Sequence, residues 1–151
     1  EYASKCDHIT EFGVRGVVSL WGWLMGGPKK LVGYDLYKDT NVFLIEIAAE
    51  ESGVEFEFHT ADVRKVEIEE TDMLFIDTHH IYNQLKQELK MHANKARKFI
   101  SFHDTTLFEY IGEDGGVGLW PAIEEFLEEH PEWKIKERLT DQNGFTVLER
   151  V

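Results

Sequence analysis

The residues Ile9-Thr10-Glu11-Phe12-Gly13-Val14-Arg15-Gly16-Val17-Val18-Ser19 indicate how this chain folds. The first four form an apolar run typical of a strand, and a helix is expected from about Val17 to Met25. Glycines between the two allow a tight turn and would let a ligand approach the backbone, and the helix N-terminus offers free amides to polar or anionic groups. The same residues could also form a strand-to-helix turn without a ligand. They do not match GxGxxG, which weakens a nicotinamide-binding interpretation.

Short apolar runs alternate with segments of helical period along the rest of the chain. Alternation of this kind implies an α/β fold with a mostly parallel sheet covered on both faces. The segment from Asp62 to Thr71 is too short and too acidic to be expected as a helix. After the opening unit, strands are expected at Leu31 to Leu36, Val54 to Phe58, Met73 to Ile76 and Phe99 to Phe102, and helices at Asn41 to Glu51, Tyr82 to Ala96 and Pro121 to Glu129.

The last two expected strands differ from the others because no helix separates them. They run from Trp133 to Leu139 and from Phe145 to Leu148, around the turn residues Asp141-Gln142-Asn143-Gly144. This arrangement is typical of an antiparallel hairpin. The complete prediction is a doubly wound, mostly parallel seven-stranded sheet with a C-terminal antiparallel hairpin, formed by residues 1–151 as a single domain.

Composition restricts the partners that the chain is expected to have. The formal net charge is -13, which repels phosphate groups, so no nucleic-acid partner is expected. The basic residues between Lys86 and Lys98 alternate with apolar ones, as on the wet face of a helix. No apolar run approaches the roughly 20 residues that cross a bilayer, and Glu1 to Asp7 lacks a signal-peptide pattern. With Cys6 as the only cysteine, we expect a cytoplasmic protein with no membrane partner.

Four residues at strand ends mark the expected ligand site. In doubly wound sheets the ligand lies beyond the carboxyl ends of the strands, which selects Gly13, Asp35, Asp77 and Asp104. Asp35 lies about 20 residues after the glycine turn, where an acidic side chain can accept the ribose hydroxyls of a nucleoside. Acidic residues at strand ends also serve as turn formers, which is the alternative for Asp35.

Two further groups, Asp77-Thr78-His79-His80 and His103-Asp104, follow strands that should be neighbours. Two carboxylates and an imidazole that converge there would suit a divalent cation, and a further imidazole could act as a base. The alternative is that these side chains are structural, as a single histidine at a strand end usually is.

These residues together resemble class I S-adenosylmethionine-dependent methyltransferases, and more narrowly the group related to cephalosporin hydroxylase-type proteins and macrolide sugar O-methyltransferases. The resemblance lies in three blocks: Ile9 to Gly16, Leu74 to Tyr82, and Phe102 to Thr105, the last followed by Gly116-Val117 and Ala122 to Trp133. It implies a Rossmann-like fold and S-adenosylmethionine as cofactor. It also implies roles for individual residues: Glu11, Gly13 and Gly16 beside the methionine part, Asp35 at the ribose, Asp62 by the adenine, Asp77, His103 and Asp104 as metal ligands, and His80 as base.

The chain departs from this group at two positions. Where that group has an acidic residue before the last strand-end aspartate, this chain has His103. Where that group often has a glycine after Gly16, this chain has Val17. A histidine donor favours manganese, iron or zinc over magnesium, unless His103 contacts only the ligands.

The expected function is metal-assisted O-methyl transfer to a small hydroxylated metabolite or sugar. A metal-bound hydroxyl loses its proton more easily, and an imidazole can accept that proton near pH 7. Any element that caps the substrate would come from the loops, from further residues or from a partner subunit in a homo-oligomer. Two alternatives are a non-catalytic nucleoside- or cofactor-binding domain and a nicotinamide-dependent oxidoreductase.

Overall fold

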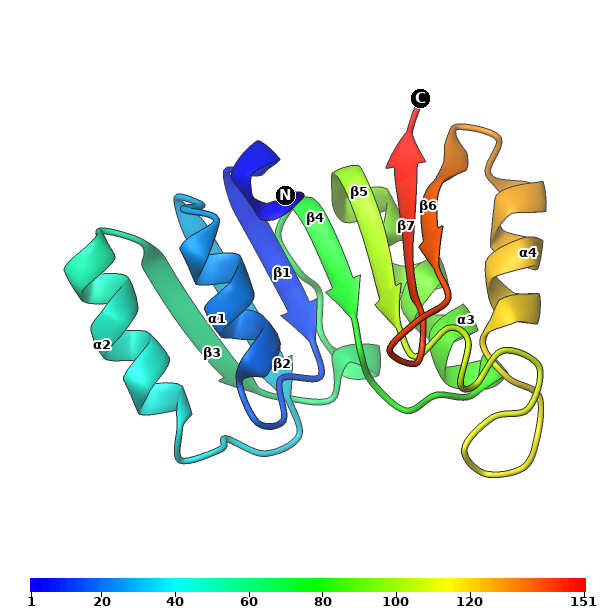
Figure 1. Ribbon diagram of the computed structural model, residues 1–151, viewed down its shortest axis with the longest axis horizontal. Helices are drawn as coiled ribbons and strands as arrows, with labels where there is room; N and C mark the ends of the chain where they lie inside the picture. Colours follow the sequence, from blue (N-terminus) through cyan, green and yellow to red (C-terminus); the bar gives the residue numbers. More distant parts are fainter.

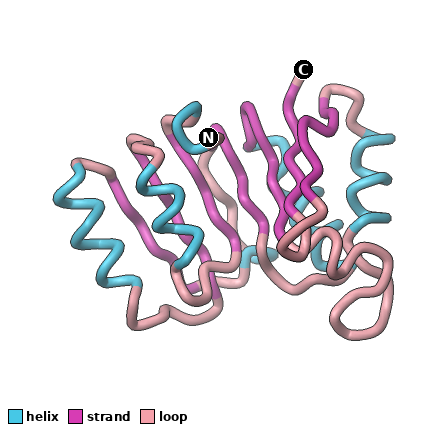
Figure 2. The backbone as a smooth tube through the Cα atoms, viewed as in Figure 1, coloured by secondary structure: helices cyan, strands magenta, loops and turns pink.

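A computed structural model describes residues 1–151 as a seven-stranded sheet with helices on both faces (Figures 1 and 2). The strand order is β3-β2-β1-β4-β5-β7-β6. The first five strands in sequence are parallel, and β7 is antiparallel to both of its neighbours. This confirms the predicted fold class. The strands are β1 His8–Phe12, β2 Lys30–Asp35, β3 Glu55–Thr60, β4 Thr71–Ile76, β5 Ala96–His103, β6 Trp133–Leu139 and β7 Phe145–Arg150.

The helices divide the apolar core into two clusters, one on each face of the sheet. The helices α1 (Val18–Met25) and α2 (Val42–Ser52) bury side chains such as Leu20 and Ile45 against one face. On the other face, α3 (Tyr82–His92) and α4 (Trp120–Glu129) contribute Leu85 and Ile123. Three short 3-10 turns, η1 (Ala3–Lys5), η2 (Val63–Lys65) and η3 (Ala93–Lys95), complete the elements. No helix is both long and apolar enough to cross a membrane.

The boundary between α3 and β5 differs from the sequence-based prediction. The helix was expected to reach Ala96, but it ends at His92, and β5 begins at Ala96 rather than at Phe99. The reason is tertiary: Ala96 pairs with Thr71 of β4, and the charged residues that follow it in β5 form ion pairs with the buried Asp72. A strand can therefore begin with charged residues when its neighbour supplies the opposite charge.

The basic residues between Lys86 and Lys98 consequently do not share one helix face. They are divided among α3, η3 and β5, and four of them pair with carboxylates from two other parts of the chain. The pairs are Lys86 with Glu125, Lys95 with Glu67, and Arg97 and Lys98 with Asp72. These ion pairs agree with the interpretation that the basic residues of this segment have a structural role and do not form a nucleic-acid-binding patch.

Candidate functional site

The carboxyl ends of β1, β2, β4 and β5 lie at one edge of the sheet, the lower edge in Figure 1. Because these strands are parallel, their end residues meet there, as expected for a doubly wound sheet. Gly13 follows β1, Asp35 ends β2, and Asp77 and Asp104 follow β4 and β5. The strand order changes direction between β1 and β4, so this edge contains the switch point where ligands bind in such folds.

Gly13 is a glycine because the end of β4 approaches it. Its φ is +83°, and a Cβ atom there would lie 1.9 Å from the backbone carbonyl oxygen of Asp77. The protein's own backbone therefore approaches Gly13 closely, which is by itself a reason for a glycine at this position. Gly16 differs, since a Cβ atom would meet nothing within 4 Å. The open side of the turn is therefore at Gly16, and contact of either glycine with the methionine part of a cofactor stays a prediction.

The turn itself holds two non-glycine residues at positive φ, Arg15 at 43° and Val17 at 61°. A β-branched residue at positive φ is unusual, because its side chain crowds the backbone. Val17 occupies the position where the resembling group often has glycine, which fits this conformation without strain. The conformation is maintained in part by Asp35, whose Oδ2 accepts hydrogen bonds from the backbone nitrogens of Val14 (2.9 Å) and Arg15 (2.8 Å).

Asp35 therefore has a structural role besides the ribose-binding role that was predicted for it. Its Oδ1 accepts a hydrogen bond from the Tyr37 nitrogen at 3.2 Å. The carboxylate links the end of β2 to the turn after β1, at the spacing expected for a nucleoside site. Whether it also accepts ribose hydroxyls stays a prediction.

Glu11 is completely buried at the end of β1 and has an unsatisfied carboxylate oxygen. Ser19 donates a hydrogen bond to its Oε1. Oε2 and the Trp23 Nε1 atom make no hydrogen bond of normal geometry, but the Trp23 side chain is close enough to favour the charged form of the carboxyl. Burial raises the pKa of Glu11 to about 8, and the negative charges of Asp77 and Asp35 act in the same direction. A buried carboxylate without a counter-charge is costly, so this position favours a cationic group in the turn beside it.

Asp62, which was expected near an adenine, is bound by the side chain of its neighbour Arg64. The guanidinium donates from Nε to Oδ1 and from Nη2 to Oδ2, both at 3.0 Å, and the Arg64 nitrogen also donates to Oδ1. These hydrogen bonds lower the pKa of Asp62 to about 2. Asp62 thus caps η2, and its contact with an adenine stays a prediction.

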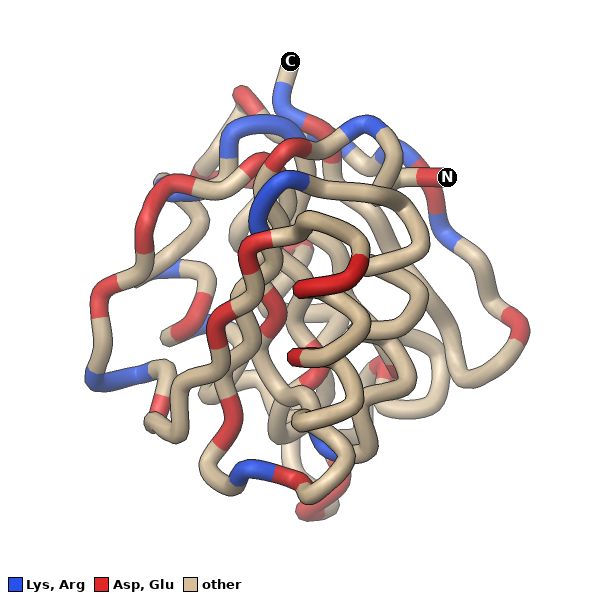
Figure 3. The backbone as a smooth tube through the Cα atoms, turned by 90° about the vertical axis from the view of Figure 1, so that its left-hand side faces the viewer, with Lys and Arg blue, Asp and Glu red and all other residues tan.

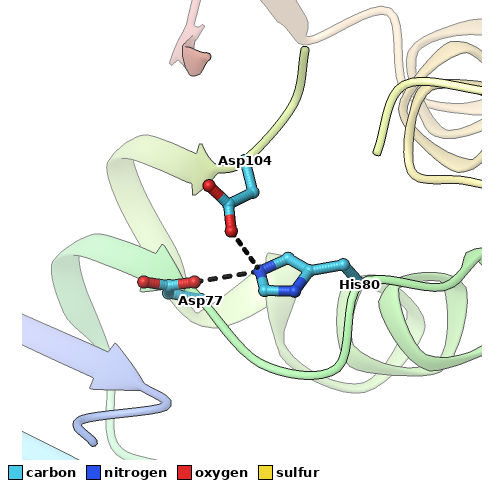
Figure 4. A group of neighbouring side chains, drawn as sticks. All are labelled: Asp77, His80 and Asp104. Carbon is cyan, nitrogen blue, oxygen red and sulfur yellow. Dashed lines mark hydrogen bonds and ion pairs between the residues drawn. The ribbon is translucent and has the colours of Figure 1, made fainter. Parts of the chain in front are cut away.

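A second group of side chains, Asp77, His80 and Asp104, converges beside the first (Figure 4). The His80 Nε2 atom lies 3.0 Å from Asp77 Oδ1 and 3.3 Å from Asp104 Oδ2. One donor atom from each residue lies within 4.8 Å of the others, so the three could hold one metal ion. Burial by itself would lower the pKa of His80, but its hydrogen bond to Asp77 and the charges of Asp104, Asp77 and Glu113 outweigh it and raise the pKa.

His103 lies at the margin of this group. Its Nδ1 is 3.0 Å from Asp104 Oδ1 and 3.8 Å from Asp77 Oδ2, and 36% of its side chain is exposed. The sequence-based prediction assigned Asp77, His103 and Asp104 as metal ligands and His80 as base. The structure brings all four residues together, but the imidazole between the carboxylates is that of His80.

Two residues in contact with His80 were not identified from the sequence, and both come from the long connection between β5 and α4. Glu113 Oε1 accepts a hydrogen bond from the His80 backbone nitrogen at 2.9 Å and lies 3.5 Å from Nδ1 of the same residue. The ring of Phe108 stacks on the imidazole with centroids 4.9 Å apart. No local pattern could have found them, because they lie about 30 positions away in the sequence.

Glu88 was also missed, although the sequence contained a signal for it. It shares one face of α3 with Leu85, Leu89 and His92, all buried, so a charged residue stands on an apolar stripe. Thr78 Oγ1 donates to its Oε1 at 2.8 Å, which ties α3 to the loop that carries His80. Burial raises the pKa of Glu88 to about 7.

A narrow cleft lies beside His80 between β4, β5 and α3. Half of its lining residues are apolar, and polar side chains occupy the remainder of the wall. The lining consists of Ile76, Thr78, His79, His80, Leu85, Phe102, His103 and Leu119. The site therefore combines a candidate cation position, three imidazoles and a partly apolar wall.

Comparison with solved structures identifies the fold. The N-methyltransferase NodS from Bradyrhizobium japonicum is similar over 96% of this chain and 86% of its own, with a TM-score of 0.65 and 12% identity. A putative O-methyltransferase from Klebsiella pneumoniae is similar over 99% of this chain and 75% of its own, with a TM-score of 0.67 and 15% identity. The 1,6-didemethyltoxoflavin-N1-methyltransferase from Burkholderia thailandensis was solved with S-adenosylhomocysteine. It is similar over 100% of this chain and 77% of its own, with a TM-score of 0.66 and 12% identity.

No protein-family model matches the chain, and no curated protein matches it. At these identities the likeness concerns the fold. The chain thus has the Rossmann-like fold of S-adenosylmethionine-dependent methyltransferases, as the sequence resemblance implied.

Proposed function

We propose that this domain is an S-adenosylmethionine-dependent methyltransferase that transfers a methyl group to an oxygen of a small hydroxylated metabolite or sugar, assisted by a divalent cation. The observation that carries the proposal is the group Asp77, His80 and Asp104, which lies at the switch-point edge of a methyltransferase-like sheet. The turn after β1, which would hold the cofactor, lies next to this group, because Gly13 is close to the backbone of Asp77.

The cofactor half of the proposal rests on the turn after β1. The methionine part of S-adenosylmethionine carries an ammonium and a sulfonium, and the unsatisfied carboxylate of Glu11 would compensate positive charge in this turn. Gly16 leaves open space on the same turn. Asp35 would accept the ribose hydroxyls with the lone pairs that the backbone nitrogens leave free, and Asp62 would lie towards the adenine.

The donor set fits a divalent metal. Two carboxylates and one imidazole suit manganese, iron or zinc better than magnesium, which prefers oxygen ligands. A bound cation would lower the pKa of an acceptor hydroxyl and hold its oxygen in place. Because His80 Nε2 points between Asp77 and Asp104, we assign His80 as the third ligand. His103 would then accept the proton of the hydroxyl, which exchanges the roles predicted for the two histidines.

The acceptor would bind against the connection between β5 and α4. Phe108 stacks on His80, and Leu107 and Tyr110 of the same connection are exposed. Apolar and aromatic side chains of this kind suit the flat face of a phenol or the C–H face of a sugar. The hydroxyl to be methylated would point from that surface towards Asp104.

Calorimetry can separate this proposal from the alternatives. The protein should bind S-adenosylhomocysteine with or without metal and should not bind NAD. Methyl transfer to a panel of hydroxylated sugars and phenols should require a divalent ion and stop in excess chelator. Cofactor binding without transfer to any acceptor would favour a non-catalytic binding domain, and full transfer in chelator would refute the metal mechanism.

The histidine roles have their own test. His80→Ala should abolish metal binding in a calorimetric titration, whereas His103→Ala should retain it. Removal of a general base typically slows turnover about a hundredfold to ten-thousandfold, so His103→Ala should do so with metal bound. If His80→Ala binds metal normally and His103→Ala does not, the roles are those predicted from the sequence.

A further inference from the structure

The outer faces of α1 and α2 expose large apolar side chains. Both helices cover the same face of the sheet and lie side by side (Figure 1). On α1, Val18 is 82% and Met25 is 87% exposed, although both are large and hydrophobic. With the other exposed residues of these helices they form an apolar face made of Val18, Trp21, Met25, Phe43, Leu44 and Ile47.

This apolar face is at the upper end of what a single protein surface exposes. Side chains of this size expose on the order of 150–250 Å² when fully accessible, so the exposed fractions of the six amount to roughly 600 Å². The largest apolar patch on a typical monomer is about 300–600 Å², and each partner in a standard interface buries about 800 Å². The apolar face therefore supplies most of the area that one side of a stable interface needs.

Charge favours an apolar protein partner over a membrane. Acidic residues are spread over much of the chain (Figure 3), and the net charge is -13. An anionic bilayer would repel such a protein. By contrast, α1 contains no charged residue. On α2, Glu46 at the edge of the apolar face is paired with Lys38 at 2.7 Å, while Glu50 and Glu51, at the C-terminal end of the helix, are exposed and form no ion pair. Two copies also carry like net charge, so they can meet only where the contact itself is uncharged. The length of α1 and the first turns of α2 meet this condition, with Glu50 and Glu51 outside the contact.

The shape of α1 suits contact with an identical helix. Gly22 lies in the exposed stripe between Trp21 and Met25, and a Cβ atom on it would meet nothing within 4 Å. It leaves open space beside Trp21, which is 39% exposed. In an interface with twofold symmetry each surface meets its own copy, so Trp21 of one chain would pack over Gly22 of the other.

We propose that the apolar face on α1 and α2 is the interface of a homodimer, with the two α1 helices crossing at Gly22. This surface lies on the face of the sheet opposite to α3 and α4. The proposal does not depend on the methyltransferase function, because the apolar face contains none of the residues proposed to bind the cofactor or the metal.

Sedimentation velocity between about 1 and 100 µM tests the dimer, because standard interfaces of this size bind in or below that range. The wild-type chain should sediment as twice its mass of 17.6 kDa. Trp21→Lys should raise the dissociation constant at least tenfold. The matched control is Ile135→Lys, which places a lysine at an exposed apolar position on β6 and should leave the dimer intact. A monomeric wild type at the highest concentration, or a Trp21→Lys dimer as tight as wild type, would overturn the proposal.

A cross-linking experiment covers the case in which Trp21→Lys fails to fold. Gly22→Cys should not disturb α1, since the space around Gly22 is open, and the only natural cysteine, Cys6, is buried. Under mild oxidation Gly22→Cys should form a disulfide-linked dimer much faster than the control Ile135→Cys. Equal cross-linking rates for the two variants would refute the crossing at Gly22.

Discussion

Glu11 provides the most informative test of the site, because its charge is predicted to be costly until a cofactor arrives. In the folded chain its pKa is about 8, raised by complete burial from its ordinary value of 4.5. The folded state therefore binds one more proton at Glu11 than the unfolded state between these two pH values. Stability should fall as pH rises through that interval and should reach its lower limit above about pH 8.

The size of this effect follows from the shift. One pKa unit corresponds to about 1.4 kcal/mol, so the rise at Glu11 is worth at most about 5 kcal/mol of unfolding free energy between pH 5 and pH 9. Glu11→Gln replaces the carboxyl by a neutral group of the same shape, and it should remove most of that loss. Glu88, whose pKa is raised to about 7, contributes in the same direction and remains present in this variant.

Urea unfolding at pH 5, 7 and 9 measures the prediction. Glu11→Gln should gain stability relative to wild type as pH rises, and the difference should be largest at pH 9. The control Glu128→Gln changes an exposed carboxyl and should follow the wild-type curve. If wild type and Glu11→Gln lose the same stability between pH 5 and pH 9, Glu11 is not a buried, uncompensated acid, and the argument for a cationic group beside it fails.

Three further predictions concern the strand ends. Gly13→Ala should destabilise the fold by more than about 1 kcal/mol in urea unfolding, because its Cβ would meet the Asp77 carbonyl at 1.9 Å, whereas Gly16→Ala should leave stability nearly unchanged. Asp35→Ala should weaken S-adenosylhomocysteine binding by about 1 to 3 kcal/mol in calorimetry, and unchanged affinity would remove it from the ribose site. Asp104→Asn should lose metal binding and turnover together while cofactor binding persists, so a variant that keeps metal affinity would contradict its role as a ligand.

Local sequence patterns were sufficient to predict the order and type of the elements. The period-2 and apolar runs identified all seven strands, and β6 was predicted with its observed bounds, Trp133–Leu139. The glycine turn, Asp35, Asp77 and Asp104 could be placed at one edge of the sheet for a simple reason. The carboxyl ends of parallel strands meet at one edge of the sheet for any conformation of the loops. Alternation of strands and helices is therefore enough to predict that these residues lie near one another.

The roles of individual residues could be explained only from the structure. Gly13 was identified as important, but only the register of β1 and β4 shows that the Asp77 carbonyl occupies the space of its side chain. Asp62 was placed near a cofactor, and its hydrogen bonds to Arg64, only two residues away, are a local contact that the sequence analysis did not identify. The end of α3 at His92 likewise depends on pairing of the next residues with β4.

The arrangement of the two histidines, His80 and His103, could not be predicted from the sequence. His80 and His103 were both predicted at the site, because each is close to a strand-end aspartate in the sequence. Which imidazole lies between the carboxylates depends on side-chain direction, and for His80 that direction is set by contacts with Glu113 and Phe108 from the distant β5–α4 connection. The sequence by itself determined that these groups meet at one edge of the sheet. Only packing between segments far apart in the chain decided how they face one another, since side-chain orientation depends on neighbours that no local pattern specifies.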